Sequence, residues 1–387
     1  MAEDSRGLLR RVLETAGQVL DPDRIAGAKR RQADMFAWRE SDYVPVLFGG
    51  EVEALNGLPD FDWARQFADP AASLYMQMKD AVRAASAGCD YVPTVRADTG
   101  VINGPSILGA PYGVPAHTKP VCTGRVPKEP LAAFEVPEDI RPLGVMPTMI
   151  EHTQHHLAAL REAGLGELVG VRHCDTQGPF DIAAQARGHV EIFLDLYADG
   201  DFVHALMQKC TEVYRKMNLL SKQLAGHPLD RGYANEYWMD RGSARLCDDS
   251  GILISREQYQ EFCAPYVAKA LEPFGGGWVH YCGGVPDGNR PEGLHLHETY
   301  CSIPNNRGLQ FTTGRDWPAE VKKVIERKLV YLGGLPRRDG EELEDYFRRV
   351  LGLCDGRRGM ILNAAVKPAE RPQAMETWHR VQDELFR

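Results

Sequence analysis

The chain has 387 residues, of which 43% are hydrophobic and 26% are charged, and its formal net charge is −9 at pH 7. This composition is ordinary for a folded globular protein and excludes a disordered, fibrous or coiled-coil chain. The acidic balance argues against nucleic-acid binding, because phosphate contacts need a local excess of lysine and arginine. No apolar stretch approaches the roughly 18 residues that a membrane-spanning helix needs, and segment 1–21 lacks the apolar centre of a secretory signal. Nine cysteines without regular spacing indicate a reducing compartment, so we expect a cytoplasmic protein.

Residues 4–20 place apolar side chains at helical spacing, which predicts an amphipathic helix at the start of the chain. Short β-branched or aromatic runs then alternate with longer helical patterns. The expected strands are 43–48, 91–95, 168–174, 244–247, 278–282, 309–312, 329–332 and 360–363. The expected helices are 180–196, 202–224, 255–271, 318–327 and 341–353.

Strand followed by helix, repeated about eight times, predicts an α/β fold of the (β/α)8 TIM-barrel type. We expect residues 1–40 to form an N-terminal helical segment that packs on the barrel, and residues 41–387 to form a single barrel domain. The Pro- and Gly-rich segment 100–130 is long for a βα loop, and it is either a surface insertion or a lid that faces substrate.

Chemistry in a parallel barrel belongs at the carboxyl ends of the strands. Few of the expected strand ends are purely apolar, which favours an enzyme over a binding scaffold. The polar residues at these ends are Arg96, Asp98, His173, Cys174, Asp175, Cys247, Asp248, Asp249, His280, Cys282 and Asn363.

The sharpest local motif is His280-Tyr281-Cys282 within an expected strand. Residues two apart in a strand point to the same face, so His280 and Cys282 should both face the barrel interior. An imidazole beside a thiolate suits Zn2+, which takes mixed nitrogen and sulfur ligands. The alternative is a hydrogen-bonded interior histidine beside a buried cysteine.

The helix that precedes this strand carries a second motif. Ser255 is a good N-cap with Gln258 three residues later, which predicts a capping box. The order Ile254-Ser255-Arg256-Glu257-Gln258-Tyr259, Phe262, Pro265-Tyr266 and then His280-Tyr281-Cys282-Gly283 resembles the uroporphyrinogen decarboxylase superfamily, whose members include cobalamin-dependent methyltransferases. Gly178-Pro179-Phe180 and Tyr43-Val44-Pro45-Val46 extend the resemblance over residues 40–375. It implies a (β/α)8 barrel.

The resemblance is closer to the methyltransferase branch, because the first and last expected strands lack the groups of the true decarboxylases. That branch holds zinc with a His-x-Cys pair and a second cysteine on the last strand. Here Ala364 and Ala365 stand in that region. The remaining ligands would then come from other strand ends, with Cys247, Asp249, Glu236, His173 and Asp175 as candidates.

The first functional hypothesis that follows is a zinc-assisted methyltransferase with His280 and Cys282 as metal ligands. It would move a methyl group between a small methylated substrate, an ether or an amine, and a corrinoid. The chain has no Asp-x-His-x-x-Gly corrinoid motif, so the corrinoid would be carried by a partner protein. Asp249 or Glu236 would complete the zinc site, and the family implies a homodimer.

The rival hypothesis is a decarboxylase or lyase of a small carboxylic acid on the same barrel. Asp248 or Asp249 would exchange protons with His280, with His173 as a further catalytic candidate, and Arg96 would hold the carboxylate through its planar fork.

Other clusters also have two interpretations. The aromatic and polar group Tyr233, Asn235, Glu236, Tyr237 and Trp238 either lines a pocket for a planar ligand, together with Asn363, or packs in the barrel wall. His152, His155 and His156 share one helical face, which we expect to be exposed because no third metal ligand is evident beside any pair of them.

Overall fold

The expected strand segments form parallel sheet structure in the computed structural model, which describes residues 4–282, 293–311 and 316–387. Six strands form one parallel sheet in the order β1-β12-β11-β10-β9-β8, and β2 pairs with β5. Their bounds are β1 Val46–Leu47, β2 Thr94–Val95, β5 Gly170–Val171, β8 Ala244–Cys247, β9 Gly277–Tyr281, β10 Asn306–Phe311, β11 Val330–Gly333 and β12 Met360–Asn363. Each of the eight overlaps one expected strand, so the α/β prediction is confirmed.

Two further contacts link β2 and β5 to the larger sheet. Gln177, which follows β5, forms an isolated parallel bridge with Cys247 of β8. At the other edge, the backbone N–H of Asp90, which precedes β2, donates to the carbonyl of Val46 in β1 at 2.9 Å. The strand segments therefore follow one another in the spatial order β2, β5, β8, β9, β10, β11, β12 and β1.

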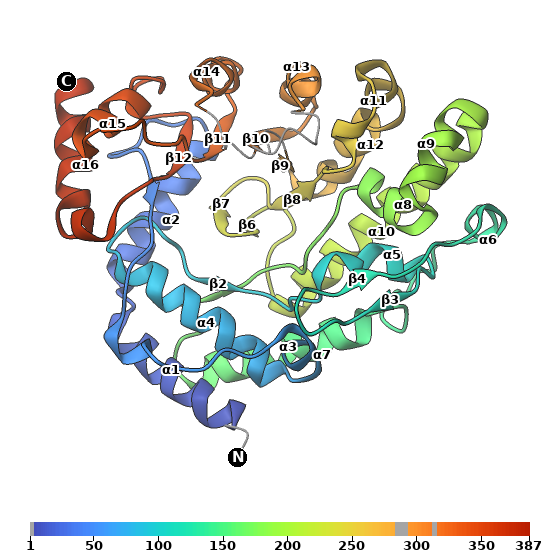
Figure 1. Cartoon of the computed structure of the whole chain (residues 1–387), viewed down its shortest axis with the longest axis horizontal. Coiled ribbons are helices and arrows are strands. Elements are labelled where there is room, and N and C mark those ends of the chain that lie inside the picture. Colours follow the sequence, from blue (N-terminus) through green and yellow to red (C-terminus); the bar gives the residue numbers. More distant parts are fainter. Residues whose placement is uncertain (1–3, 283–292, 312–315) are drawn as a thin grey trace.

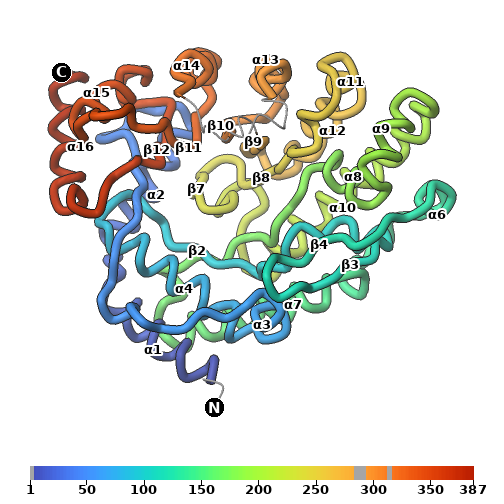
Figure 2. The backbone as a smooth tube through the Cα atoms, in the orientation of Figure 1, coloured from blue at the N-terminus to red at the C-terminus, as the bar shows by residue number. Residues whose placement is uncertain are grey.

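Most helices lie around the outside of these strands (Figure 1), and the tube in Figure 2 traces the same path. The bounds are α1 Ser5–Val19, α2 Pro22–Phe36, α3 Trp63–Ala68, α4 Pro70–Ser86, α5 Asn103–Ile107, α6 Lys128–Ala133, α7 Met146–Glu162, α8 Pro179–Arg187, α9 His189–Ala198, α10 Gly200–Ala225, α11 Arg256–Phe262, α12 Ala264–Leu271, α13 His297–Ser302, α14 Pro318–Glu326, α15 Leu343–Leu351 and α16 Arg371–Leu385. Within the described residues, no helix combines the length and the apolar character that crossing a bilayer requires.

The strands bury different residues on their two faces. On β9, Val279 and Tyr281 belong to the large core between strands and helices, whereas Trp278 packs in a second cluster on the inner face. That inner cluster contains Phe36 of α2, and Tyr237 of an antiparallel hairpin, β6 Gly232–Ala234 and β7 Tyr237–Met239. The hairpin and α2 therefore fill the inside, and Figure 1 shows the hairpin in the middle of the strands.

Local chemistry explains several element boundaries. Asp21 caps α2, and its side chain accepts hydrogen bonds from two backbone N–H groups of the first turn. The capping box of Ser255 and Gln258 is present at the start of α11, which confirms that prediction. The single helix expected over 180–196 is wrong, because Gly188 has a φ of 99° and divides α8 from α9.

The single helix expected over 255–271 is also wrong, because the chain leaves helical geometry at Cys263, between α11 and α12. Segment 100–130, expected to be an insertion or a lid, contains α5, the start of α6 and, between them, a short antiparallel hairpin, β3 Tyr112–Gly113 and β4 Val121–Cys122. His152 and His156 are buried on α7, so the expectation of an exposed histidine face is wrong for these two residues. The reason is that α7 packs against α4, which covers part of its polar surface.

Candidate metal and active site

Cys247 and His280 are neighbours because of the register between two parallel strands. Cys247 of β8 lies opposite His280 of β9, and Leu246 lies opposite Val279. Val279 packs toward the helices, so the alternation along β9 turns His280 to the inner face together with Trp278. The same alternation turns Cys247 inward at the carboxyl end of β8.

Asp249 and Cys282 follow these strands and complete a four-residue group, which we call the Cys-Asp-His-Cys cluster: Cys247, Asp249, His280 and Cys282. Asp249 Oδ2 lies 3.0 Å from Cys247 Sγ, and Asp249 Oδ1 lies 3.5 Å from His280 Nε2. Cys282 Sγ lies 3.4 Å from the same His280 nitrogen. The Cys282 backbone N–H donates to Asp249 Oδ1 at 3.0 Å, which ties the end of β9 to the end of β8.

Burial sets the protonation of the cluster. It raises the pKa of the Cys247 thiol well above its ordinary value, against the opposing charge of Arg245. Burial and then Arg245 lower the pKa of His280, while Asp249 opposes them. The imidazole is therefore neutral at pH 7 and offers a lone pair, whereas the thiol of Cys247 needs a cation before it ionises.

The donor set fits zinc. One imidazole nitrogen, two sulfurs and one carboxylate oxygen are all ligands that tetrahedral Zn2+ accepts. Ligand atoms around such an ion stand about 3.5 Å apart, given metal–ligand bonds of roughly 2.0 to 2.3 Å. The ligand atoms of Cys247, Asp249 and His280 all lie within 4.8 Å of one another, with distances of 3.0 and 3.5 Å that are close to this spacing. Cys282 stands outside this group of three and adds a contact of 3.4 Å to His280.

Asp181 holds the backbone beneath Asp249 in place. It lies in the first turn of α8, where its carboxylate accepts the N–H of Asp249 at 2.9 Å and that of Ser250 at 2.7 Å. Burial, then the nearby Asp249 and Asp248, raises its pKa well above the ordinary value. Asp181 was not identified as a site residue from the sequence, although the motif Gly178-Pro179-Phe180 directly precedes it. Gly178 donates its N–H to the Cys247 carbonyl at 2.6 Å, an approach at which a side chain would collide with that oxygen.

Asp248 belongs to the opposite face of β8. The hydroxyl of Tyr259 donates to its carboxylate, and the hydroxyl of Tyr300 donates to its backbone carbonyl. Burial raises the pKa of Asp248 to about 7, although Tyr259 opposes that rise. Asp248 therefore does not face His280, whereas Asp249 lies 3.5 Å from His280 Nε2, so Asp249 is the carboxylate that the lyase hypothesis would pair with this histidine.

Arg96 lies in an ion network on the inner side of β2, β5 and β8. Asp175 contacts Arg96 at 3.1 Å and Arg245 at 2.9 Å. Asp98 contacts Arg96 at 3.1 Å and Lys119 at 2.8 Å. Burial alone would raise the pKa of Asp175, but Arg96 and Arg245 hold it well below its ordinary value. The Nη2 atom of Arg96 is therefore paired with two protein carboxylates, whereas its Nε is buried without a hydrogen-bond partner among the described residues.

His173 supports the β6–β7 hairpin and not the cluster. Its Nε2 accepts the backbone N–H of Asn235 at 3.1 Å, and its Nδ1 lies 2.7 Å from the Cys174 carbonyl. Nδ1 therefore carries the ring proton. Burial lowers the pKa of His173 to about 3, so the ring stays neutral. Asn235 has a φ of 56°, a conformation that asparagine tolerates better than most residues, and His173 stabilises that turn.

The aromatic and polar group of the hairpin divides into two parts. Tyr233 packs in a small cluster with Ala28 and Val92, away from the strand ends. Tyr237 is buried beside Trp278. Burial and then Glu236 raise the pKa of Tyr237 well above its ordinary value. The side chains of Asn363 and Gln310 oppose this rise, so both side chains lie near the Tyr237 hydroxyl. Glu236 accepts a hydrogen bond from the Asn235 side chain.

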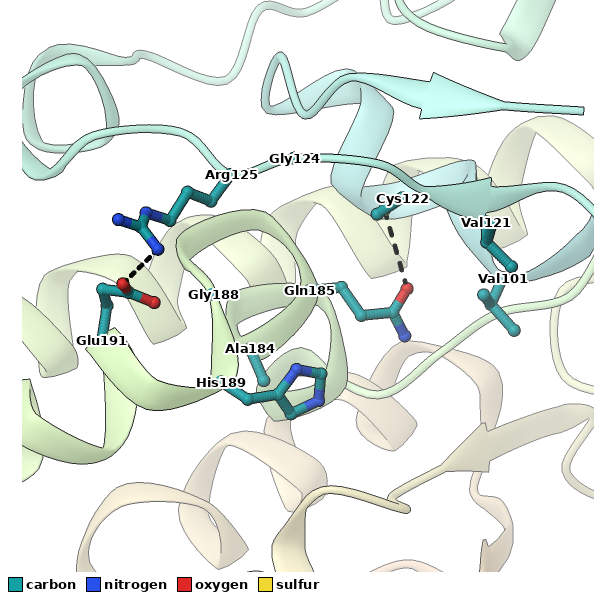
Figure 3. A pocket seen from close by; sticks show the side chains of 10 residues that line it. All are labelled: Val101, Val121, Cys122, Gly124, Arg125, Ala184, Gln185, Gly188, His189 and Glu191. Carbon is teal, nitrogen blue, oxygen red and sulfur yellow. Dashed lines mark hydrogen bonds and ion pairs between the residues drawn. The ribbon is translucent and has the colours of Figure 1, made fainter.

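A cavity of about 460 Å3 adjoins this end of the strands, between the β3–β4 hairpin and the α8–α9 junction. Figure 3 shows Arg125 and Glu191 pointing toward each other across it, and Gln185 turned toward Cys122. His189 lines the cavity, and its Nε2 lies 3.3 Å from Ser250 Oγ. Ser250 follows Asp249, so His189 connects the cavity wall with the segment after β8, although neither Ser250 nor a residue of the cluster lines the cavity.

Comparison with known proteins identifies a shared fold. No family model and no curated protein matches the chain. Among solved structures, a methyltransferase from Methanosarcina mazei is similar at a TM-score of 0.62, with 16% identity, over 93% of this chain and 99% of that one. At this identity the likeness establishes the fold.

Proposed function

We propose that the chain is a zinc-assisted methyltransferase built on a closed (β/α)8 barrel. The observation that carries the proposal is the Cys-Asp-His-Cys cluster at the carboxyl ends of β8 and β9, where barrel enzymes place their chemistry. The similarity in fold to a methyltransferase supports the reaction class, and the contacts of Gln177 with β8 and of Asp90 with β1 support closure.

The metal ligands of this proposal are Cys247, Asp249, His280 and Cys282. Cys247 and Asp249 compensate for the cysteine that related methyltransferases carry on the last strand. Bound zinc would supply a Lewis acid that polarises a methyl ether or amine, or would lower the pKa of an acceptor thiol. Asp181 keeps the Asp249 backbone in place through two hydrogen bonds.

The substrate side of the site consists of groups on the inner face. Glu236 stands in the turn of the β6–β7 hairpin inside the strands, and we propose it as the carboxylate that contacts the substrate heteroatom. The amides of Asn235 and Asn363 and the hydroxyl of Tyr237 offer hydrogen bonds to a small polar molecule. A small methylated ether or amine is the substrate class that we propose.

A partner protein that carries a corrinoid is the second component. Helix α9 exposes Val190, Leu194 and Tyr197 by 67%, 63% and 82%, at spacings of four and three residues along one face. Exposed apolar surface of this kind is typical of protein–protein contact. Since α9 also borders the cavity of Figure 3, a partner there would stand near the strand ends.

Elemental analysis of the full chain, purified without chelator, tests the metal site. We expect near-stoichiometric zinc in the wild type and its loss in Cys247→Ser and in Cys282→Ser. Cys122→Ser is the matched control, because Cys122 lies in the cavity outside the cluster. Absence of metal from the wild type, or zinc retained in both cluster variants, would contradict the proposal.

A further inference from the structure

Arg172 is a cation on the inner face that forms no ion pair with the residues that the structure describes. It follows β5, and its backbone N–H donates to the Val95 carbonyl. Gly170, two residues earlier, faces the ring of Tyr233 on the inner hairpin, whereas Val171 packs toward the helices. The alternation therefore turns Arg172 inward. Its Nε and Nη1 atoms are buried, and neither has a hydrogen-bond partner.

Arg96 and Arg245 also bury an Nε atom without a hydrogen-bond partner in the described part of the chain, but unlike Arg172 each of them is ion-paired. Arg96 and Arg245 share Asp175, and Lys119 and Arg96 share Asp98. Asp175 and Asp98 are thus already paired with other cations. Among the residues that the structure describes, no carboxylate lies within ion-pair distance of Arg172. A buried guanidinium without a counter-ion is costly, and such groups persist where a ligand supplies the missing charge.

The same interior connects Arg172 with the cluster. Burial and then Arg96 lower the pKa of Arg172 to about 10, while Glu236 raises it. Glu236 also raises the pKa of His280. Geometry links the same groups: His173, next to Arg172, accepts the N–H of Asn235, which precedes Glu236. Asp175 joins Arg96 to Arg245, which stands two residues before Cys247 on β8. Arg172 and the cluster therefore belong to one inner surface, on which a small bound molecule would face both.

We propose that Arg172 binds a carboxylate of the substrate, so that the substrate class is a methylated carboxylic acid. The assignment rests on the proposed function for the identity of the methylated group, and on Arg172 alone for the anion. The planar guanidinium presents two parallel N–H groups to a planar carboxylate. One unmatched positive charge fits a monoanion better than a phosphate dianion.

Isothermal titration of the full chain at constant ionic strength tests this with two pairs of probes. The acids are methoxyacetate and para-methoxybenzoate, and their uncharged partners are methoxyethanol and para-methoxybenzyl alcohol. We expect at least one acid to bind the wild type at least tenfold more tightly than its alcohol. Arg172→Met should weaken that binding at least tenfold, and Arg172→Lys should fall between the two, because it keeps the charge and loses the fork. Arg215→Met, on the outside of α10, is the control for loss of one positive charge.

Melting temperature separates a binding role from a structural one. Removal of an unpartnered buried charge should raise the melting temperature of Arg172→Met, whereas removal of a structural contact would lower it. Equal binding of the acids to wild type and Arg172→Met, no binding of either acid, or a lowered melting temperature would overturn the assignment. Zinc measured on the same samples reports separately on the proposed function, because the anion titration needs no turnover.

Discussion

Replacement of His156 by phenylalanine should make the protein less sensitive to acid. His156 is fully buried on α7, and neither ring nitrogen has a hydrogen-bond partner. Burial, followed by the neighbouring His152 and His155, lowers its pKa to about 3. In the unfolded chain the pKa returns to about 6.5. Between these values the unfolded chain binds more protons, so the free energy of unfolding falls as the pH drops below about 6.5.

The size of the effect follows from these two pKa values. At about pH 5.5, one unit below the unfolded pKa, protonation of the unfolded chain at this site costs about 1.4 kcal/mol of stability, and at about pH 7.5 it costs less than about 0.1 kcal/mol. His156→Phe removes this contribution. The difference in unfolding free energy between variant and wild type should therefore shift by about 1.4 kcal/mol in favour of the variant between the two conditions.

Urea unfolding followed by circular dichroism at both pH values measures this difference. Comparison across pH cancels any packing change that phenylalanine introduces, and it also cancels the other histidines. His117→Phe is the matched control, because His117 is exposed. A variant whose stability relative to wild type is the same at both pH values would refute the reasoning.

Two further substitutions test residues that hold the backbone around the site in place. Asp181→Asn keeps one acceptor oxygen for the two N–H groups of Asp249 and Ser250, so we expect a loss of about 1–2 kcal/mol in urea unfolding together with reduced zinc content; unchanged values of both would remove Asp181 from its positioning role. Gly170→Ala places a methyl group 2.2 Å from the Tyr233 ring, so we expect destabilisation of about 1–3 kcal/mol, whereas Gly17→Ala, with nothing within 4 Å on helix α1, should be neutral or stabilising in the same assay.

The strands were predictable because their signal is local. Short apolar runs such as 329–332 and 360–363 are bounded by polar segments, and β11 and β12 formed there. Alternation within one strand also predicted that His280 and Cys282 share a face, and their side chains lie 3.4 Å apart. These inferences need only the periodicity of one segment.

The partner of His280 could not be chosen from the sequence, because it depends on register between strands. Cys247 was one of five candidates for the remaining ligands. A slip of one residue would place Leu246 opposite His280 and would turn Cys247 toward the helices. The observed register, Cys247 opposite His280, results from packing along the whole of β8 and β9.

The environments of Arg172 and His156 could not be predicted for a related reason. The role of each polar side chain depends on which groups tertiary packing places around it. Arg172 is unusual because the carboxylates of Asp98 and Asp175 form ion pairs with other cations. From the sequence, His156 is one of three polar residues on one helix face, whereas in the structure α4 packs against α7. A single sequence contains no signal for such coverage.

The two proposed sites also fix the direction in which a substrate lies. Arg172 precedes Gln177 by five residues, and Gln177 bridges Cys247 at the carboxyl end of β8. Arg172 is therefore deeper along the strands than the Cys-Asp-His-Cys cluster. In the proposed arrangement, a substrate held at Arg172 by its carboxylate would extend its other end toward the strand ends, where the cluster lies. Its methyl group would then stand on the side proposed for the partner protein, and its carboxylate on the closed side, where Tyr237 and α2 fill the interior.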